Sequence, residues 1–229
     1  ADMVNWTDHG TIAVAGAKGA AKWAANSWAP AACHKKINGK EKFFLYFANN
    51  ASSIGVLTAD SPVGPWTDPT VSEEKPEGEA LINRSIGNCG EKDVQWLFDP
   101  AVLIDDDGQG YLYFGGFGNA STPAYNKNPK CARVIKLGDD MVSTVGDAVT
   151  IDAPYMFEDS GINKINGKYY YSYCTNWTSE ASANKYVGSA TIAVMESDNP
   201  MTGFKYVGSV LKNPGTAFKA YGNNHHCFA

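Results

Sequence analysis

The sequence has little positive charge and no long apolar run. Its 19 Lys and Arg residues are outnumbered by 24 Asp and Glu, which gives a formal net charge of -5. No basic cluster offsets this balance, so nucleic acid is not expected as a partner. No apolar stretch approaches the ~20 residues that a membrane-spanning helix needs. We therefore predict that the protein binds neither nucleic acid nor membrane.

Paired cysteines are also lacking. The five cysteines are an odd number, and none forms a C-x-x-C pair. This pattern predicts neither a zinc site nor a complete disulfide framework, and it favours buried or unpaired thiols. A signal-peptide pattern is absent, and the chain opens ADMVNW without a methionine, so the sequence does not indicate a compartment.

Helical periodicity is the third missing feature. The Ala-rich stretch 11–25 is interrupted by Gly16 and Gly19, so we predict a loop with a short turn at most. Residues 69–95 are rich in charge, glycine and proline, which predicts a long insertion. The 229 residues, 44% of them hydrophobic, are enough for one large domain, which we assign to residues 1–229.

What the sequence does have is a repeated hairpin. Three segments share an apolar entry, a turn centred on glycine and a strand rich in aromatics. They are WAPAACHKKINGKEKFFLYF (28–47), FDPAVLIDDDGQGYLYF (98–114) and FEDSGINKINGKYYYSY (157–173). Their turns contain Asn38-Gly39, Asp107-Gly108 and Asn166-Gly167. Such pairs predict type I′ hairpins, because both central positions of that turn need positive φ.

Two further markers repeat with one spacing. DSPVGPW at 60–66 returns as DNPMTGF at 198–204, and DMV at 2–4 returns at 140–142. Both pairs are separated by 138 residues, which is two repeats of 69. All-strand repeats of this length predict β-propeller blades of about four strands each. A β-sandwich with incidental hairpins is the alternative, but it does not account for the shared spacing.

The repeat gives several polar residues comparable positions. Nine residues before each turn glycine stand Pro30, Asp99 and Glu158, where we predict that the innermost strands start. A comparable step along the chain reaches His225 in GNNHH. Inner strands of a propeller surround a central channel, so Asp99, Glu158 and His225 are predicted to gather around one pocket.

Two carboxyls in a pocket walled by aromatics suit glycoside hydrolysis. One of them must be a protonated general acid. Glu158 fits, because the preceding Tyr155, Met156 and Phe157 favour its neutral form by desolvation. Asp99 is the candidate for a second carboxylate that raises the pKa of Glu158 further. An inverting enzyme also needs a base, with the two carboxyls roughly 6.5–9.5 Å apart.

Aromatic side chains near these carboxyls are candidates for stacking on sugar faces. Trp28, Phe98 and Trp177 are the three, and core packing between blades is an equally favoured interpretation for each. The predicted substrate-binding set is Trp28, Phe98, Asn176, Trp177 and His225.

Taken as an ordered set, these motifs resemble family 43 of the glycoside hydrolases. The segments SWAPAACHKKINGKEKFFLYF, FDPAVLIDDDGQGYLYFGG, FEDSGINKINGKYYYSY and GNNHH carry the resemblance, which covers nearly the whole chain except 69–95. The family implies an all-β, five-bladed β-propeller, here a partial propeller with about three complete blades. It also implies an inverting β-xylosidase or α-L-arabinofuranosidase acting on arabinose- or xylose-containing plant polysaccharides or oligosaccharides.

The resemblance also implies roles for individual residues. Asp99 in FDP matches the aspartate that orients substrate and modulates the pKa of the acid, and Glu158 in FED matches the general acid. His225 matches an axial histidine that holds calcium or another ion mostly through waters, and His226 is the weaker match. No organic cofactor is implied.

The family's general base, an aspartate at the start of the first inner strand, has no match. ADMVNWTDHG resembles the outer end of that blade, so the base is expected upstream of Ala1, and Asp2 and Asp8 are interpreted as surface turn residues. The chain is thus expected to be the middle of a family member. Exposed blade edges would then favour self-association or complementation by a missing piece.

Two other functions fit parts of the pattern. A non-catalytic carbohydrate-binding propeller, or an inert fragment, is favoured by the unmatched base. A retaining enzyme of the fructosidase type also uses an Asp-Pro and a glutamate, but it expects arginine where this chain has Phe98. The sequence does not distinguish xylose from arabinose specificity.

Overall fold

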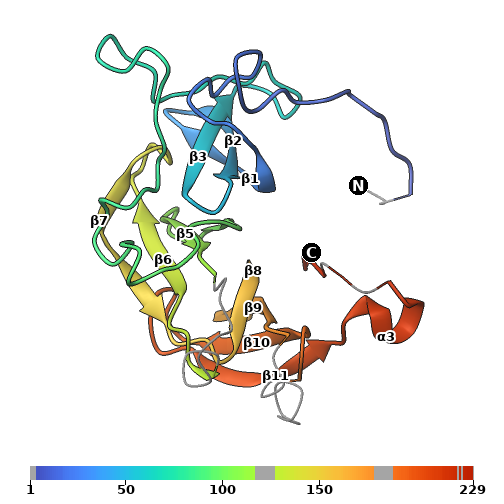
Figure 1. The fold of residues 1–229 in the computed structure, drawn as a ribbon. Helices are drawn as coiled ribbons and strands as arrows, with labels where there is room; N and C mark the ends of the chain where they lie inside the picture. Colours follow the sequence, from blue (N-terminus) through green and yellow to red (C-terminus); the bar gives the residue numbers. More distant parts are fainter. Residues whose placement is uncertain (1–3, 117–126, 178–187, 221, 223, 229) are drawn as a thin grey trace.

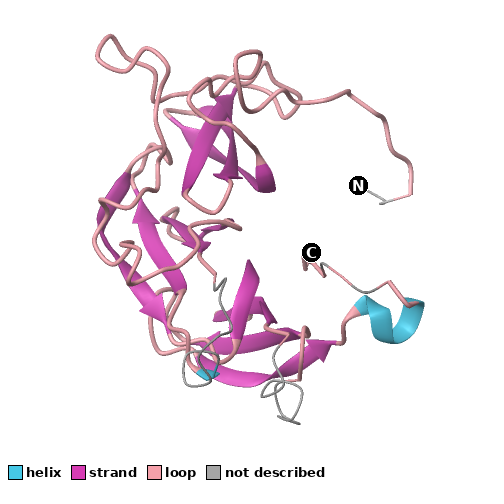
Figure 2. Cartoon of the chain, viewed as in Figure 1, coloured by secondary structure: helices cyan, strands magenta, loops and turns pink. Residues whose placement is uncertain are grey.

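The computed structural model describes residues 4–116, 127–177, 188–220, 222 and 224–228. Within these residues the strands form three antiparallel sheets, and a short helix, α3 (Pro214–Phe218), follows the last strand (Figure 2). The all-β prediction is therefore confirmed. No helix in the described part of the chain has the length and apolarity needed to cross a membrane.

Each sheet is a meander whose strands lie in chain order. The first sheet contains β1 (Trp28–Ile37), β2 (Lys40–Asn49) and β3 (Ser53–Ala59). The second contains β4 (Ala101–Ile104), β5 (Gly110–Phe114), β6 (Ala132–Leu137) and β7 (Thr144–Ile151). The third contains β8 (Met156–Ile165), β9 (Lys168–Thr175), β10 (Ile192–Ser197) and β11 (Lys205–Leu211). At the outer edge of the first sheet, Thr58 forms a bridge with Thr67 in place of a fourth strand.

The three sheets follow one another along an arc (Figure 1). Figure 1 shows β1 and β8, each the first strand of its sheet, on the inner side of this arc. Strand β4 contacts both of them, so the first strands of successive sheets are neighbours. Residues far apart in the sequence are thereby brought together at the inner side.

Two of the three predicted type I′ turns are confirmed. Asn38 and Gly39 connect β1 to β2 with φ angles of 51° and 79°. Asn166 and Gly167 connect β8 to β9 with the same two values. These are the positive φ angles that asparagine and glycine tolerate best.

The third turn prediction is wrong. Asp105 and Gln109 close the hairpin between β4 and β5, and the amide of Gly108 donates to the carbonyl of Asp105 at 2.8 Å. Only Gly108 of the predicted pair has positive φ, at 84°. This is a three-residue loop with glycine in the left-handed position, which needs one residue more than a type I′ turn.

The repeated markers lie at equivalent places. Residues 140–142 and 198–204 both fall between the third and fourth strands of their sheets, and 60–66 follows the third strand of the first sheet. The Tyr46 hydroxyl of β2 donates to the Met141 carbonyl at 2.8 Å, and the Tyr113 hydroxyl of β5 donates to the Pro200 carbonyl at 2.6 Å. The markers at 140–142 and 198–204 thus each receive a tyrosine from the preceding sheet. Asp2 lies outside the described residues.

The core lies between neighbouring sheets. Phe44, Tyr46, Leu112 and Phe114 pack between the first and second sheets. A second cluster, which includes Tyr113, Met156, Tyr171 and Tyr173, joins the second and third. Apolar faces of twisted sheets bury this way because side chains alternate along each strand.

Residues 69–95 do lie between β3 and β4, as the insertion prediction requires. They contribute Ile82 and Val94, both 0% exposed, to the core between the first two sheets. Two arginines hold this segment through main-chain carbonyls: Arg84 donates to the Gln95 carbonyl at 2.8 Å, and Arg133 donates to the Asn88 carbonyl at 2.7 Å. The insertion is therefore a packed part of the fold.

Candidate active site

Asp99 stands just before β4 and is buried, with 5% of its surface exposed. Its φ of 49° places it in the left-handed region, which aspartate tolerates better than most residues. Its Oδ2 accepts a hydrogen bond of 2.9 Å from the amide of Asp159. This bond ties the start of β4 to the start of β8.

Glu158 is the third residue of β8 and pairs with Cys174 of β9. The strand register shifts on both sides of Glu158, between Met156 and Glu158 and again before Gly161. Such bulges re-aim side chains near the end of a strand. The bulged start of β8 thus gives Glu158 a direction that a regular strand would not.

The two carboxyls have raised pKa values. Burial, together with the charges of Asp99 and Asp159, raises the pKa of Glu158 to about 7, whereas His225 acts in the opposite direction. Burial also raises the pKa of Asp99 to about 7, although the hydrogen bond from Asp159 favours its charged form. Near neutral pH this pair can therefore hold a proton, which a general acid needs.

Asp159 is a site residue that the sequence analysis left without a role. Its side chain is fully buried, and its φ is 68°. Its Oδ2 accepts hydrogen bonds from the amide of His226, at 3.1 Å, and from Nδ1 of the same residue. Its Oδ1 lies 3.0 Å from Nε2 of His225. The signal in the sequence was the adjacency of Glu158 and Asp159, but only long-range packing shows which acid is buried deeper.

Backbone geometry also changes the register of the repeat. Asp99 and Asp159 both have positive φ, and each lies six residues before the residue that closes its hairpin, Asp105 or Ile165. Asp159 rather than Glu158 is therefore the structural counterpart of Asp99. Counting from the turn glycines missed this by one position, because the loop at Asp107 is one residue longer.

His225 lies at a cavity of about 430 Å³ on the inner side of the sheets. Pro30 of β1, Ala101 of β4 and Gly161 of β8 also line it. The cavity thus lies between residues of three inner strands and His225, whereas Asp99 and Glu158 are not among the residues that line it. Their gathering around one pocket with His225 stays a prediction. Both His225 and His226 line the cavity, and the His225 side chain is the more exposed of the two, at 39% against 7%.

The predicted substrate-binding aromatics divide into two kinds. Trp28 and Trp177 are 46% and 45% exposed, so their faces are accessible to a ligand. Phe98 is 6% exposed and contacts Trp96 edge to face, with 5.2 Å between ring centroids. That environment favours the packing interpretation for Phe98. Trp96, which the sequence analysis did not select, also contacts Phe157 at 5.8 Å.

Asn176 is buried, with 2% of its surface exposed. Its amide donates to the Tyr155 carbonyl at 2.8 Å, and its carbonyl accepts from the Ala190 amide at 3.0 Å. These main-chain bonds fix the end of β9 next to Glu158. A role in binding substrate stays a prediction for this residue.

Comparison with known proteins identifies the family of this chain. The sequence model of Glycosyl hydrolases family 43 matches residues 1–202. The chain belongs to family 43 of the glycosyl hydrolases. An arabinoxylan arabinofuranohydrolase from Paenibacillus polymyxa is 61% identical over 232 residues, which cover 98% of this chain and 35% of that protein. A protein with the same name from Bacillus subtilis strain 168 is 58% identical, over 95% of this chain and 42% of its own length.

Solved structures of the same family are similar. The arabinoxylan arabinofuranohydrolase from Bacillus subtilis in complex with cellotetraose has a TM-score of 0.90 and 56% identity, over 98% of this chain and 46% of that one. An α-L-arabinofuranosidase from Clostridium thermocellum has a TM-score of 0.74 and 40% identity, over 98% and 64%. The family 43 chain described here thus spans less than half the length of the two curated relatives.

The family resemblance implies a calcium ion near His225, but the side chains there are not the ligands that calcium prefers. Calcium prefers six to eight oxygen ligands. Here the nitrogens of His225 and His226 lie against the Asp159 carboxylate, and the described residues contain no group of three or more His, Cys, Asp or Glu that could hold a metal. These side chains do not fit direct calcium ligation. An ion held through waters stays a prediction for this family 43 chain.

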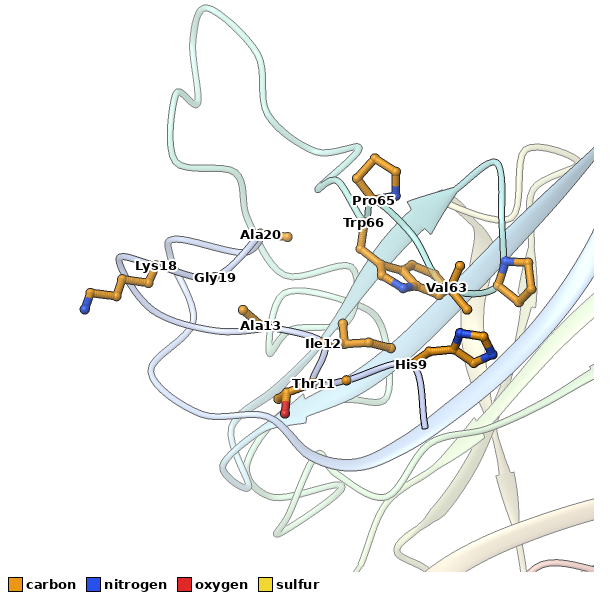
Figure 3. Close-up of a pocket in the computed structure, with 12 residues that line it drawn as sticks. His9, Thr11, Ile12, Ala13, Lys18, Gly19, Ala20, Val63, Pro65 and Trp66 are labelled. Atoms are coloured by element: carbon orange, nitrogen blue, oxygen red, sulfur yellow. The ribbon is translucent and has the colours of Figure 1, made fainter. Parts of the chain in front are cut away.

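A second cavity, of about 610 Å³, lies at the first sheet (Figure 3). Its walls come from the N-terminal segment, including His9 and Ile12, and from the turn after β3, including Val63 and Trp66. Figure 3 shows these four side chains among those that line the cavity. None of the predicted site residues lines it, so it is separate from the candidate active site.

Proposed function

We propose that this protein is an inverting glycoside hydrolase that releases arabinose from arabinoxylan. The observation that carries the proposal is the buried carboxyl of Asp99 together with the half-buried carboxyl of Glu158, whose pKa values both rise to about 7. The names of the two relatives at 61% and 58% identity support arabinoxylan as the substrate over a simple xyloside.

In this proposal Glu158 is the general acid. Its proton passes to the glycosidic oxygen as the bond to the arabinose unit breaks, so the sugar chain leaves as a neutral alcohol. The charge of Asp99 raises the pKa of Glu158 and so keeps the proton available near neutral pH. The reaction also needs a base that activates water on the opposite face of the sugar, and we assign no residue of this chain to that role.

We further propose that the three sheets are successive blades of a five-bladed propeller, with residues 1–229 in one domain. The neighbouring first strands β1, β4 and β8 support this arrangement. So do the tyrosine contacts from Tyr46 and Tyr113 to the following sheet, which repeat the same junction twice. Self-association through exposed sheet edges remains part of the proposal.

Arabinose release from arabinoxylan tests the proposal. We expect Glu158→Gln to lower this rate by on the order of 10²–10⁴-fold, because the acid is lost. The same variant should lose much less activity on a nitrophenyl arabinofuranoside, since nitrophenolate leaves without protonation. Asp198→Asn is the matched control, because Asp198 is a surface acid whose side chain is 87% exposed. Equal and measurable rates for the parent and Glu158→Gln on arabinoxylan would exclude Glu158 as the acid.

A carbohydrate-binding protein without turnover is the second candidate. The exposed faces of Trp28 and Trp177 favour it, because such faces stack on sugars whether or not a base is present. Calorimetry with arabinoxylan oligosaccharides separates the two. Measurable affinity without arabinose release would support the binder, and turnover that depends on Glu158 would exclude it.

A further inference from the structure

The segment 224–228 returns to the inner side of the arc, next to β8 (Figure 1). It has no regular secondary structure, but it forms hydrogen bonds with residues of β8 and β9 and with Ala190, which lies just before β10. The Asn224 side-chain amide donates to the Ala190 carbonyl at 2.8 Å, and the Cys174 thiol donates to Asn224 Oδ1 at 2.8 Å. The Asn163 side chain donates to the Phe228 carbonyl at 3.0 Å. The segment is therefore fixed at both ends.

Asp159 holds the middle of this segment. Both of its carboxylate oxygens face histidines: Oδ2 accepts from the amide and Nδ1 of His226, and Oδ1 lies 3.0 Å from Nε2 of His225. The Nε2 atom of His226 lies 2.7 Å from the Ser172 hydroxyl of β9. Since both ring nitrogens of His226 have partners, its orientation is fixed between β8 and β9.

A glycine makes room for this contact. A Cβ atom at Gly161 would lie 2.4 Å from the Ser172 hydroxyl and 3.1 Å from Nε2 of His226. The second register shift of β8 ends at the same residue. The bulge and the glycine together let His226 reach Asp159 and Ser172 at once.

The same link occurs twice along the inner side. Asp99 accepts the amide of Asp159, and Asp159 accepts the amide of His226. In each case a buried carboxylate, in the left-handed conformation, binds the main chain of the next inner segment. Each of these carboxylates therefore fixes the position of the neighbouring main chain.

We propose that Asp159 is a positioning residue that clamps the segment 224–228 against β8 and β9 and so places His225 at the cavity on the inner side of the sheets. The clamp rests on the proposed function only in treating this inner side as the place where substrate binds. The contacts of Asp159 themselves need no turnover. A measurement of the clamp alone can therefore decide the proposal whether or not the protein is a hydrolase.

The labelling rates of the cysteines can show whether the clamp has opened. Cys174 is buried under the segment and donates to Asn224, whereas Cys89 and Cys131 are buried in the cores between the sheets. Burial raises the pKa of all three thiols, so they react slowly until they are exposed. Cys227 is exposed and lies in the segment itself, so its labelling should be fast in every variant.

The experiment measures the rate at which iodoacetamide labels each cysteine of the folded protein, read by peptide mass spectrometry. In Asp159→Ala we expect Cys174 to be labelled on the order of 10–100-fold faster, since hydrogen bonds to a charged group are lost. Labelling of Cys89 and Cys131 should keep the parent rate. Asp198→Ala, a surface change on the same sheet, should change none of the three.

If Asp159→Ala fails to fold, His226→Ala removes the same clamp from the other side and is expected to expose Cys174 alone. Parental protection of Cys174 in the folded variant would overturn the proposal. A uniform increase for Cys89, Cys131 and Cys174 would also overturn it, because that result assigns Asp159 to global stability.

Discussion

The starts of β1 and of the two later inner strands have similar backbones but different chemistry. Ala29, Asp99 and Asp159 have φ angles of 43°, 49° and 68°, so the chain bends through the left-handed region at each place. Only the second and third positions carry a carboxyl that accepts the amide of the next inner segment. Ala29 lies eight residues before Ile37, which closes its hairpin, whereas the two aspartates each lie six residues before theirs, so only the aspartates share one register.

The positions differ in whether a hydrogen bond offsets the strain of the left-handed backbone. A residue other than glycine in the left-handed region costs roughly 1–2 kcal/mol. At Asp99 and Asp159 a buried hydrogen bond to the neighbouring main chain offsets part of that cost. Ala29 has no side-chain acceptor, so the first sheet retains the strain without this gain. The comparison predicts that equivalent substitutions should act differently at the two kinds of position.

The largest expected effect is on the pH dependence of activity. If Glu158 is the acid, turnover of arabinoxylan should fall about tenfold per pH unit above pH 7, as its proton is lost. Asp99→Asn removes a charge that raises the pKa of Glu158, so the fall should begin at a lower pH. Rate profiles from pH 4 to 9 check this, and an unmoved alkaline limb in Asp99→Asn would contradict the coupling.

The next effect is on stability as a function of pH. Folding raises the pKa of Asp99 from 3.8 to about 7, so the folded state holds its proton more tightly than the unfolded state. The resulting stability is complete below about pH 4 and is lost as the pH rises through 7, an effect of up to about 4 kcal/mol. Urea unfolding at several pH values should show that Asp99→Asn loses less stability than the parent as the pH rises. Parallel plots of unfolding free energy against pH for the two proteins would contradict this role of Asp99.

A smaller loss is expected for Asp99→Ala at pH 5. The parent carboxyl is neutral there and still accepts the Asp159 amide, so the substitution leaves that buried donor without its acceptor. We expect a loss of about 1–3 kcal/mol in the free energy of unfolding. Asp99→Asn, which keeps an acceptor oxygen, is the matched control. Equal losses in both variants would mean that this hydrogen bond is not the cause.

The smallest effect has the opposite sign. Ala29→Gly should stabilise the protein by about 0.5–1 kcal/mol, because glycine adopts a φ of 43° without steric cost. The matched change Asp99→Gly should destabilise it, since the acceptor is lost. Thermal unfolding of the two variants measures the sign of each change in stability. Destabilisation by Ala29→Gly would contradict the idea of uncompensated strain at that residue.

Several elements could be predicted because their causes are local. Asn38-Gly39 and Asn166-Gly167 form the expected turns, since the φ preference of each pair belongs to the residues themselves. Asp107-Gly108 does not, because the same pair also fits a three-residue loop and its neighbours choose between them. The buried role of residues 69–95 was not predicted either, since Ile82 and Val94 find their partners in two separate sheets.

The sequence by itself determined the all-β class and the family, because repeated local patterns encode them. Tertiary structure alone decided that Asp159 is the fully buried acid and that His226, 67 residues away, binds it. Burial and hydrogen-bond partners depend on which strands become neighbours. That information lies in the packing of distant segments rather than in any one stretch of sequence.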